Sequence, residues 1–464
     1  MTRNSEARTV DVAVIGGGPA GMTAATEAAA RGAKVVLLDE GIALGGKVLR
    51  APKASGLAPR KKEASITREL HESFALQNVK VLTGFTVWGV DEKNTVAVNA
   101  KGADSRVKAK TVILCAGAIE RVVPYPGWTL PGVFTVGGMN IMIKSGALCG
   151  KRVLVAGSGP LLLVLAENLI RSGANVAALL NATGGRTLMP GLRLLFSGLG
   201  LSRFLQGLGY LRTLAAAGVK LHKSRVVASV SRNSSGLSVG TSGVDKDWTP
   251  LRSTERRFEV DAVAVSYGLI PAIELAHQRG CRINYDEVRG HWCIVREGHC
   301  RTTQPGFYAA GDGVCVSGYE AAIIEGRIAA IEACAEAGFM SPQQAREAFR
   351  PLVRKLLPYK EFGFYLDRLS RPGKGLQQIM TDDTFVCRCE EVSLGNVRSA
   401  IIDGAADIND LKRRTRLGMG HCQGRFCGQL VNELLWEISG VRGDRQHFTS
   451  RLPVKTVTFG ELAE

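Results

Sequence analysis

The stretch that decides the fold is DVAVIGGGPAGMTAATEAAARGAKVVLLDE, residues 11–40. It predicts a buried strand, a glycine turn, an alanine-rich helix and a second buried strand that ends at an acid. Glycines at G-x-G-x-x-G spacing allow a tight turn, a close backbone approach to a pyrophosphate and close packing of the helix. A glycine turn alone is a weak signal, but the complete order, with an acid placed to bind ribose hydroxyls, predicts a dinucleotide site. Its expected residues are Gly16, Gly18, Pro19, Ala20, Gly21, Asp39 and Glu40.

The composition is that of a globular protein with several domains. A length of 464 residues suggests about three domains, and 45% hydrophobic with 22% charged residues are ordinary values. No uncharged apolar run reaches the roughly eighteen residues of a membrane-spanning helix, and the opening MTRNSEARTV lacks the apolar core of a signal peptide. Eleven cysteines, an odd number, argue against a disulfide framework. We therefore expect a protein of the reducing cytoplasm.

The net charge of +17 does not predict nucleic-acid binding. Lysines and arginines are spread along the chain, and no nucleic-acid-binding motif is recognisable. A solvated basic surface, or one that docks an acidic partner, explains the charge better. The leucine-rich residues 189–215 carry interspersed arginines and could lie on a membrane surface. Apolar helices at a domain or subunit interface are the favoured interpretation, so peripheral membrane association stays an open alternative.

A second glycine pair follows the quoted stretch. Gly45 and Gly46 predict another close approach of the backbone to the same cofactor. Lys47 either lies over that cofactor or faces solvent, and the sequence does not choose between these positions. Flavin disulfide reductases place a redox cysteine pair just after such glycines, whereas here the first cysteine is Cys115. Dithiol chemistry is therefore not expected.

Two further motifs bracket the middle of the chain. An apolar strand that ends at Ala116-Gly117, and a short strand that ends at Gly311-Asp312 before a helix, resemble fingerprints of two-dinucleotide-domain flavoproteins. Asp312 is expected to bind toward the ribityl chain and the pyrophosphate. The order of these motifs identifies the cofactor as FAD more strongly than any single motif. It also predicts that the FAD-binding domain is discontinuous.

The inserted segment begins with a second strand–turn–helix–strand pattern. Gly157 and Gly159 are present, but Leu162 replaces the third glycine and Leu180 stands where an acid or an arginine would read the ribose. The NAD(P) interpretation therefore loses its two most specific supports. A different nucleotide, or an empty relic of the fold, is favoured.

Four cysteines near the end predict a metal centre. Cys387 and Cys389 stand one residue apart in FVCRCEEV, and Cys422 and Cys427 stand in GMGHCQGRFCG. Four thiolates are the ligands of a [2Fe–2S] cluster, and two short helical segments between the pairs would bring them together. Zinc also binds four thiolates, but the single spacer Arg388 is shorter than the usual two to four residues. The cluster is favoured over zinc, and four structural thiols are the third alternative.

The C-terminal region resembles the bacterioferritin-associated-ferredoxin type of [2Fe–2S] domain. Residues 10–445 resemble the α (A) subunits of heteromeric amino-acid and opine dehydrogenases, including octopine and nopaline oxidases, proline and hydroxyproline dehydrogenases, and hydrogen cyanide synthase. The elements that carry the resemblance are CRCEEV (387–392), GMG-x-CQGR-x-C (418–427), PYPGWTLPGVFTVGG (124–138) and GSGPLLLVLAENL (157–169). One departure is His421, where the family usually has proline, which changes the loop but not the four ligands.

The resemblance implies a role in electron transfer. A separate β subunit, an FAD-dependent amine oxidoreductase, would oxidise the C–N bond of the substrate, and a small γ subunit would complete some assemblies. ATP or another nucleotide would occupy the second domain near Gly157 and Gly159 in some members. Two other hypotheses are a self-contained NAD(P)H-dependent flavin oxidoreductase and a scaffold that senses nucleotides. No arrangement of histidines, serines or carboxylates nominates a catalytic base.

The expected fold is α/β, a two-dinucleotide-binding-domain flavoprotein of the Rossmann-like, glutathione or thioredoxin reductase-like type, with a small helical [2Fe–2S] domain. The expected division is an FAD-binding domain (1–118 and 258–338), a second nucleotide-binding-like domain (119–257), a helical linker (339–380), a [2Fe–2S] domain (381–445) and a C-terminal tail (446–464).

Overall fold

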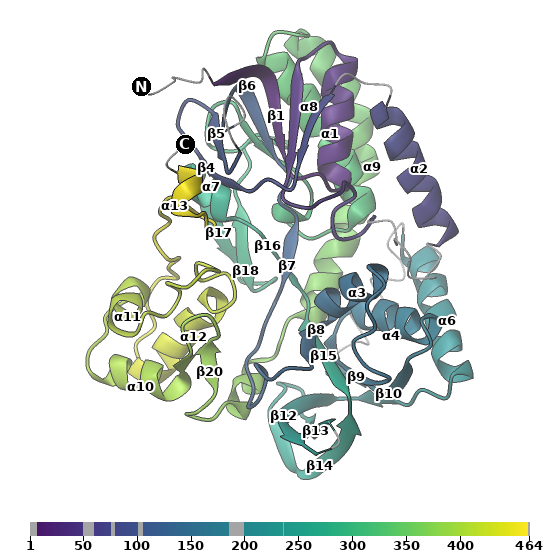
Figure 1. Ribbon diagram of the computed structural model, residues 1–464, viewed down its shortest axis with the longest axis vertical. Coiled ribbons are helices and arrows are strands. Elements are labelled where there is room, and N and C mark those ends of the chain that lie inside the picture. The colour runs from purple at the N-terminus through teal and green to yellow at the C-terminus, as the bar shows by residue number, and fades with distance from the viewer. Residues whose placement is uncertain are drawn as a thin grey trace.

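The computed structural model describes residues 7–49, 60–75, 79–100, 105–184, 199–234 and 236–462. It contains two Rossmann-like units, here the first and second domains, and a small helical C-terminal domain (Figure 1). This architecture confirms the predicted α/β fold with two Rossmann-like units and a small helical domain. At the centre of the first domain is β1 (Arg8–Ile15), in which Val12, Ala13 and Val14 are completely buried. A parallel strand that is covered on both faces reads as a continuous apolar run, which explains the start of the quoted stretch.

The first sheet has seven strands in the order β3-β2-β1-β6-β5-β4, with β19 paired to β6. β1, β2, β3, β6 and β19 run parallel to one another, β5 pairs antiparallel with β6, and β4 pairs antiparallel with β5. The bounds are β2 (Val35–Asp39), β3 (Val79–Thr83), β4 (Val87–Val90), β5 (Thr95–Val98), β6 (Arg106–Leu114) and β19 (Phe307–Ala309). Because β19 comes from far along the chain, two separate segments build this sheet.

Helices cover one face of this sheet, namely α1 (Pro19–Ala30), α2 (Lys61–Ala75), α8 (Tyr319–Glu336) and α9 (Pro342–Ser370). Of these, α1 and α8 meet through small side chains. A Cβ atom on Gly326 would lie 2.2 Å from the carbonyl oxygen of Ala20, so only glycine permits this packing of α8 on α1. α9 begins at a capping box between Ser341 and Gln344 and runs beside α8 toward the second domain (Figure 1).

The second domain has a five-stranded parallel sheet in the order β11-β10-β9-β15-β8. Its strands are β8 (Val133–Thr135), β9 (Arg152–Ser158), β10 (Asn175–Asn181), β11 (Leu221–Lys223) and β15 (Ala262–Tyr267). Its helices are α3 (Val136–Lys144), α4 (Leu161–Arg171) and α6 (Gly200–Ala216). An antiparallel sheet of β12 (Arg225–Asn233), β13 (Gly236–Val244) and β14 (Pro250–Val260) packs against it.

The return to the first domain comes later than residue 258, where we expected it. β15 lies between β9 and β8, so the apolar run up to Tyr267 belongs to the second sheet. The two crossings between the domains are β7 (Ala118–Glu120) and β16 (Leu269–Pro271), which pair with each other. A buried parallel strand carries no sign of which sheet it joins, so the sequence placed this boundary wrongly.

The C-terminal domain has one small core. Its elements are β20 (Phe385–Cys387), β21 (Val392–Ser393), α10 (Leu394–Ile402), α11 (Ile408–Thr415) and α12 (Gly428–Ser439), whereas the preceding η4 (Lys374–Ile379) packs into the core of the second domain. The two short helices expected between the cysteine pairs are α10 and α11, with Ser393 and Asp407 as their N-caps. Val397, Leu411 and Val431 are completely buried between the helices.

The tail after residue 445 joins the C-terminal domain to the first domain. The ring of Phe448 belongs to the core of the C-terminal domain. The backbone N–H of Val454 donates to the carbonyl of Trp88 at 3.0 Å, and Asn99 donates to Glu461 at 2.9 Å. The last helix, α13 (Phe459–Leu462), therefore lies beside β4 (Figure 1). The tail is an integral connection between two domains.

Only part of the leucine-rich segment 189–215 lies within the described residues, which resume at Leu199. In α6 the side chains of Leu201, Phe204 and Leu205 are exposed. Arg203 forms an ion pair with Glu320 at the start of α8. Within the described residues, no helix combines the length and apolarity that crossing a membrane requires.

A pair of histidines links the tail to the first domain and predicts a pH effect. The rings of His277 and His447 meet edge to face at 4.8 Å. Burial, reinforced by His447, lowers the pKa of His277 to about 4. Below the ordinary histidine pKa of about 6.5 the unfolded chain binds a proton that the folded chain does not. We expect the melting temperature to fall between about pH 6.5 and 4, and to fall less in His277→Phe.

The control for this measurement is His71→Phe, which changes an exposed histidine on α2. Because other groups titrate in the same range, the difference between the variant and the wild-type slopes is the informative quantity. Parallel curves for His277→Phe and the wild type would contradict the prediction.

Candidate cofactor sites

The predicted dinucleotide turn lies between β1 and α1. Gly16 has a φ of +104°, and a Cβ atom there would lie 2.3 Å from the carbonyl oxygen of Cys115. A Cβ atom on Gly21 would lie 1.7 Å from the carbonyl oxygen of Gly16. Gly18 is the N-cap of α1 and offers no side chain to its first N–H groups, and Pro19 follows it. The first turn of α1 is therefore open for an anion, as a pyrophosphate requires.

The two acids at the end of β2 have different surroundings. The carboxylate of Asp39 accepts hydrogen bonds from the backbone N–H groups of Gly17 and Gly41. It thus stands beside the glycine turn. Glu40 instead forms an ion pair with Lys455 of the tail. Burial raises the pKa of Glu40, but the charge and hydrogen bond of Lys455, together with the charges of Lys47 and Arg425, outweigh burial and leave the pKa below its ordinary value.

The second glycine pair packs directly on the first turn. The N–H of Gly45 donates to the carbonyl of Gly17 at 2.8 Å. Gly46 has a φ of +58°, and a Cβ atom there would lie 2.9 Å from the Cα of Gly18. This cradle without side chains fits a diphosphate. The ammonium of Lys47 donates to the carbonyl of Ala118 at 2.7 Å, so this exposed side chain reaches the domain crossing.

The two later motifs come together with the glycine turn. Because β19 pairs with β6, the segments that follow these strands, Ala116-Gly117 and Gly311-Asp312, are neighbours. A Cβ atom on Gly313 would lie 3.0 Å from the N of Gly117, and one on Gly311 would lie 3.0 Å from the Cβ of Ala20. One carboxylate oxygen of Asp312 accepts from Ser317 and Gly318, and burial raises its pKa. Residues from four separate segments therefore enclose one site.

Sequence reasoning missed Glu325, which anchors the Gly-Asp motif. Its side chain is 1% exposed and accepts a hydrogen bond from the N–H of Gly311 at 2.7 Å. Arg296 and Lys360 lie 2.9 and 2.6 Å from the same carboxylate. Burial raises the pKa of Glu325, but the two cations outweigh burial and lower it. The available signal was an acid on the buried, alanine-rich face of α8.

The second glycine turn is covered by the end of α9. The hydroxyl of Ser158 donates to the carbonyl of Ser370 at 2.7 Å. A Cβ atom on Gly159 would lie 2.7 Å from the hydroxyl oxygen of Ser370, and Gly268 contacts the same residue. Gly157 adopts a φ of +129° beneath this contact. The space above the turn, where a pyrophosphate lies in this fold, is therefore lined by the chain itself.

This contact predicts that nicotinamide nucleotides do not reduce the protein. A large excess of NADH or NADPH should leave the flavin absorbance and the melting temperature unchanged, because Ser370 occupies the space above Gly159. Stopped-flow absorbance under anaerobic conditions makes the measurement, and dithionite serves as the positive control. Rapid bleaching by either nucleotide would show that the end of α9 moves aside.

The four cysteines of the C-terminal domain meet in two pairs. Cys387 contacts Cys427, and Cys389 contacts Cys422, through hydrogen bonds between their thiols. The Cys427 thiol and the backbone N–H of Gly418 lower the pKa of Cys387 to about 6. Two pairs of thiols supply the four sulfur ligands that a [2Fe–2S] cluster needs, so the residues fit this cluster.

The glycines around the cysteines have a packing role as well. Gly418 and Gly424 have positive φ values of +79° and +80°, and their Cβ atoms would lie 2.9 and 2.5 Å from the ring of Phe448. A Cβ atom on Gly420 would lie 2.4 Å from the Cβ of Cys389. The tail thus packs directly under the cysteine loops, a role that the sequence did not reveal.

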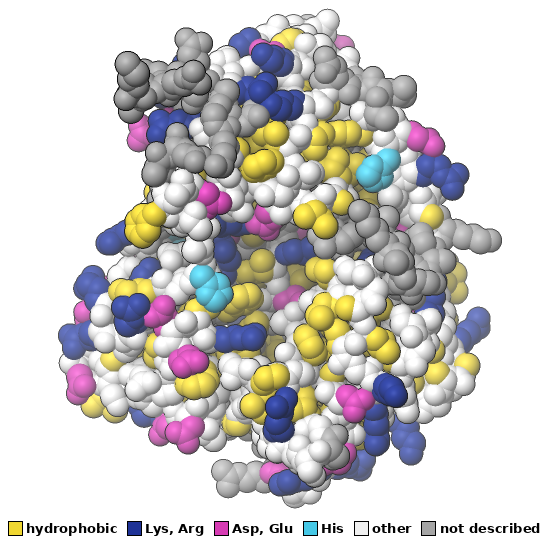
Figure 2. Space-filling view, in the orientation of Figure 1, with side chains coloured by type: hydrophobic (Ala, Val, Ile, Leu, Met, Phe, Trp, Pro, Cys, Tyr) yellow, Lys and Arg dark blue, Asp and Glu magenta, His cyan; other side chains and the backbone are white. Residues whose placement is uncertain are grey.

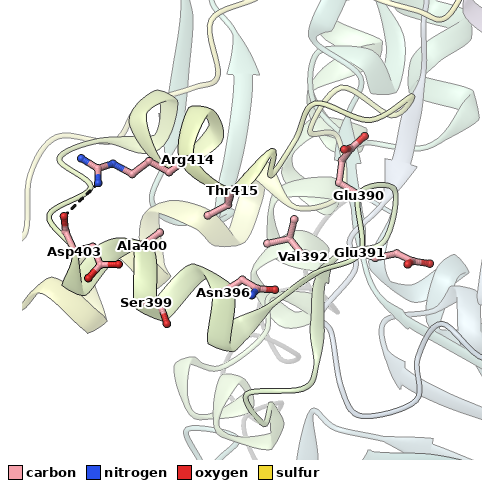
Figure 3. A pocket seen from close by; sticks show the side chains of 9 residues that line it. All are labelled: Glu390, Glu391, Val392, Asn396, Ser399, Ala400, Asp403, Arg414 and Thr415. Atoms are coloured by element: carbon pink, nitrogen blue, oxygen red, sulfur yellow. Dashed lines mark hydrogen bonds between the residues drawn. The ribbon is translucent and has the colours of Figure 1, made fainter.

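The arginines near the cysteines are held by carboxylates. Arg416 pairs with Glu390 at 2.7 Å, and Arg425 pairs with Glu274 of the first domain at 3.2 Å. Arg414 pairs with Asp410 at 3.0 Å and donates to the carbonyl of Asp403 at 3.2 Å, across an open surface pocket (Figure 3). This pocket of about 490 Å³ faces outward beside Glu390 and Glu391. These arginines therefore form ion pairs on the surface of the C-terminal domain and with the first domain.

Similarity to known proteins agrees with both sites. Residues 10–348 match the family described as pyridine nucleotide-disulphide oxidoreductase, and residues 385–437 match the BFD-like [2Fe–2S] binding domain. The chain is 34% identical over 457 residues to hydrogen cyanide synthase subunit HcnB of Pseudomonas aeruginosa, covering 96% of this chain and 97% of the relative. It is 32% identical over 470 residues to the A subunit of opine oxidase from Agrobacterium tumefaciens, covering 98% and 91%.

The fold is similar to that of the crystal structure of L-proline dehydrogenase from P. horikoshii. The TM-score is 0.70 at 24% sequence identity, and the match covers 99% of this chain and 80% of the other. The FAD cradle and the paired thiols lie within the two matched segments. The chain therefore belongs to the pyridine nucleotide-disulphide oxidoreductase family, and it is an oxidoreductase whose FAD-binding fold is joined to a BFD-like [2Fe–2S] domain.

Proposed function

We propose that this protein is the electron-transferring subunit of a heteromeric dehydrogenase that oxidises the C–N bond of an amino acid, an imino acid or an opine. The observation that carries the proposal is the presence of an FAD cradle and four paired thiols on one chain. The relatives HcnB and the A chain of opine oxidase are named as subunits, which supports a heteromeric assembly. Substrate would bind on a partner β subunit that carries its own flavin, and a small γ subunit would complete some assemblies.

The chemistry comes from the cofactors and the geometry from the chain. FAD accepts a hydride and releases electrons singly, and a [2Fe–2S] cluster carries one electron at a time. The residues proposed to hold the FAD are Gly16, Gly18, Pro19, Ala20, Gly21, Asp39, Gly45, Gly46, Ala116, Gly117, Gly311 and Asp312. Those proposed to hold the cluster are Cys387, Cys389, Cys422 and Cys427. Glu40 and Lys47 border this site, with protein partners of their own.

The chain itself positions the loop that carries Asp312. Glu325, neutralised by Arg296 and Lys360, holds the N–H of Gly311 and thereby the loop that carries Asp312. A buried carboxylate that forms ion pairs with two cations and accepts from a backbone donor makes this loop rigid. We also propose a cytoplasmic location, which the eleven free cysteines support.

Co-purification tests this function. The tagged chain is expressed together with a flavin oxidoreductase encoded beside it, and the complex is assayed for dye-linked oxidation of amino acids, imino acids and opines. We expect the partner to co-purify and activity to require both chains. The control is the complex of the partner with the Cys387→Ser variant of this chain. This complex should assemble but should not support full electron transfer. Substrate oxidation by this chain alone would contradict the proposal.

A further inference from the structure

A cavity of about 680 Å³ lies between the second domain and the C-terminal domain. Its walls come from the loop 121–132, from β8 and the start of α3, from the end of β15 and from both cysteine loops. The space-filling view shows a hollow in this region with hydrophobic side chains on its walls (Figure 2). Small-molecule sites in proteins have volumes of about 300–1,000 Å³, so this cavity can hold a ligand.

The lining selects a flat and uncharged or anionic ligand. Tyr125, Trp128, Phe134 and Phe426 supply aromatic surface. Two arginines line the cavity, and its described lining contains no carboxylate. The carboxylate of Glu120, which adjoins the lining residue Gly138, already accepts hydrogen bonds from the backbone N–H groups of Gly137 and Gly138, so the charged side chains on the lining itself are the two arginines. The cavity does not suit the substrate of the proposed reaction.

The cavity adjoins the paired thiols. Arg388 stands between Cys387 and Cys389, and Phe426 directly precedes Cys427. Phe426 is 38% exposed and Met142, another lining residue, is 37% exposed, so one side of the cavity is open. A ligand in this position would be next to the cluster site and reachable from solvent.

Two lining residues carry buried polar atoms that lack a partner within the described part of the chain. They are the Nε of Arg121 and the hydroxyl of Tyr267, whose residues are 8% and 1% exposed. The guanidinium of Arg121 is held from one side by the carbonyls of Arg289 and Gly290. Buried donors without partners are rare, and small side-chain rotations would let acceptor oxygens of a ligand satisfy both.

We propose that this cavity binds the ring of a quinone-class electron acceptor. A quinone is planar and apolar, and its two carbonyl oxygens accept hydrogen bonds from donors such as Arg121 and Tyr267. Its tail leaves through the open side between Met142 and Phe426. The assignment rests on the proposed function, which supplies the electrons. Oxidation of a C–N bond releases two electrons and two protons, and a quinone takes up two electrons and two protons to become a quinol.

Calorimetric titration with a short-chain benzoquinone tests this site in the full chain, loaded with its cofactors and its partner and without substrate. We expect one quinone to bind per chain. Val123→Trp fills the cavity and should weaken binding by about tenfold or more, whereas Val441→Trp, at an exposed position, should not change it. Tyr267→Phe removes one donor without changing the shape of the residue and should weaken binding by about fivefold. Tyr365→Phe on α9 is its control.

Three results would overturn the assignment. Equal quinone affinity of the wild type, Val123→Trp and Tyr267→Phe would show that the quinone does not bind in this cavity. A second flavin released by the wild type and absent from Val123→Trp would identify a flavin as the occupant. Loss of the partner from Val123→Trp, with quinone binding unchanged, would make the cavity an interface between subunits. Because binding is measured without substrate, each result is independent of whether the C–N oxidation is correct.

Discussion

Cys422→Ser should purify without its iron–sulfur chromophore and should no longer pass electrons at the native rate. Cys422 is 6% exposed and its thiol meets that of Cys389, so the change removes one of two thiols from a pair. A serine hydroxyl is not ionised near neutral pH and does not replace a thiolate as a ligand. Changes outside the ligand shell typically cost about 10–100-fold in metal affinity or activity, and we expect a ligand change to cost more.

Iron and acid-labile sulfide per chain, and the signal of the reduced cluster in electron paramagnetic resonance, measure this effect. FAD content should stay near the wild-type value, because the cradle lies in another domain. The matched control is Cys149→Ser, which changes a half-buried free cysteine of the second domain, outside the cysteine loops. Full iron content in Cys422→Ser would show that Cys422 is not a ligand. Zinc in place of iron in the purified wild type would show that the four thiols do not hold an iron–sulfur cluster.

Gly46→Ala should purify without FAD. The new methyl group would lie 2.9 Å from the Cα of Gly18, a backbone atom that moves only if the first turn of α1 moves. The cradle would then widen at the position where the pyrophosphate needs closest approach. We expect FAD affinity to fall by about 100-fold, which equals roughly 2.7 kcal/mol. Flavin absorbance per chain, and titration of the apoprotein with FAD, give the measurement.

Gly32→Ala separates backbone strain from the loss of the cradle. Gly32 also has a positive φ, +86°, but a Cβ atom added there would have no heavy atom within 4 Å. Both alanines carry the cost of the left-handed region, about 1–2 kcal/mol, and only Gly46→Ala meets another backbone atom. Gly32→Ala should therefore lower the melting temperature slightly and keep its FAD. Equal FAD loss in the two variants would show that strain, and not the cradle, is responsible.

The sequence predicted the local motifs because each has a chain-local cause. At Gly16 and Gly21 an added Cβ atom would meet a backbone carbonyl, so the turn itself requires glycine there, and the one-residue spacing of Cys387 and Cys389 predicted metal ligands within one short segment. The contacts of Glu325 could not be predicted from the sequence, because its partners Arg296 and Lys360 lie on other elements. The same holds for Phe448, which packs on Gly418 and Gly424 from the tail.

The sequence by itself determined the order of the units, the glycine turns and the two cysteine motifs, because these depend on residue type and spacing within short segments. Only the tertiary structure decided that Ser370 covers the second glycine turn, that β15 stays in the second sheet, and that a cavity opens beside the cysteine loops. Each of these depends on which surfaces meet after the chain has folded. Contacts between distant segments follow from packing and burial, which no periodicity in one segment encodes.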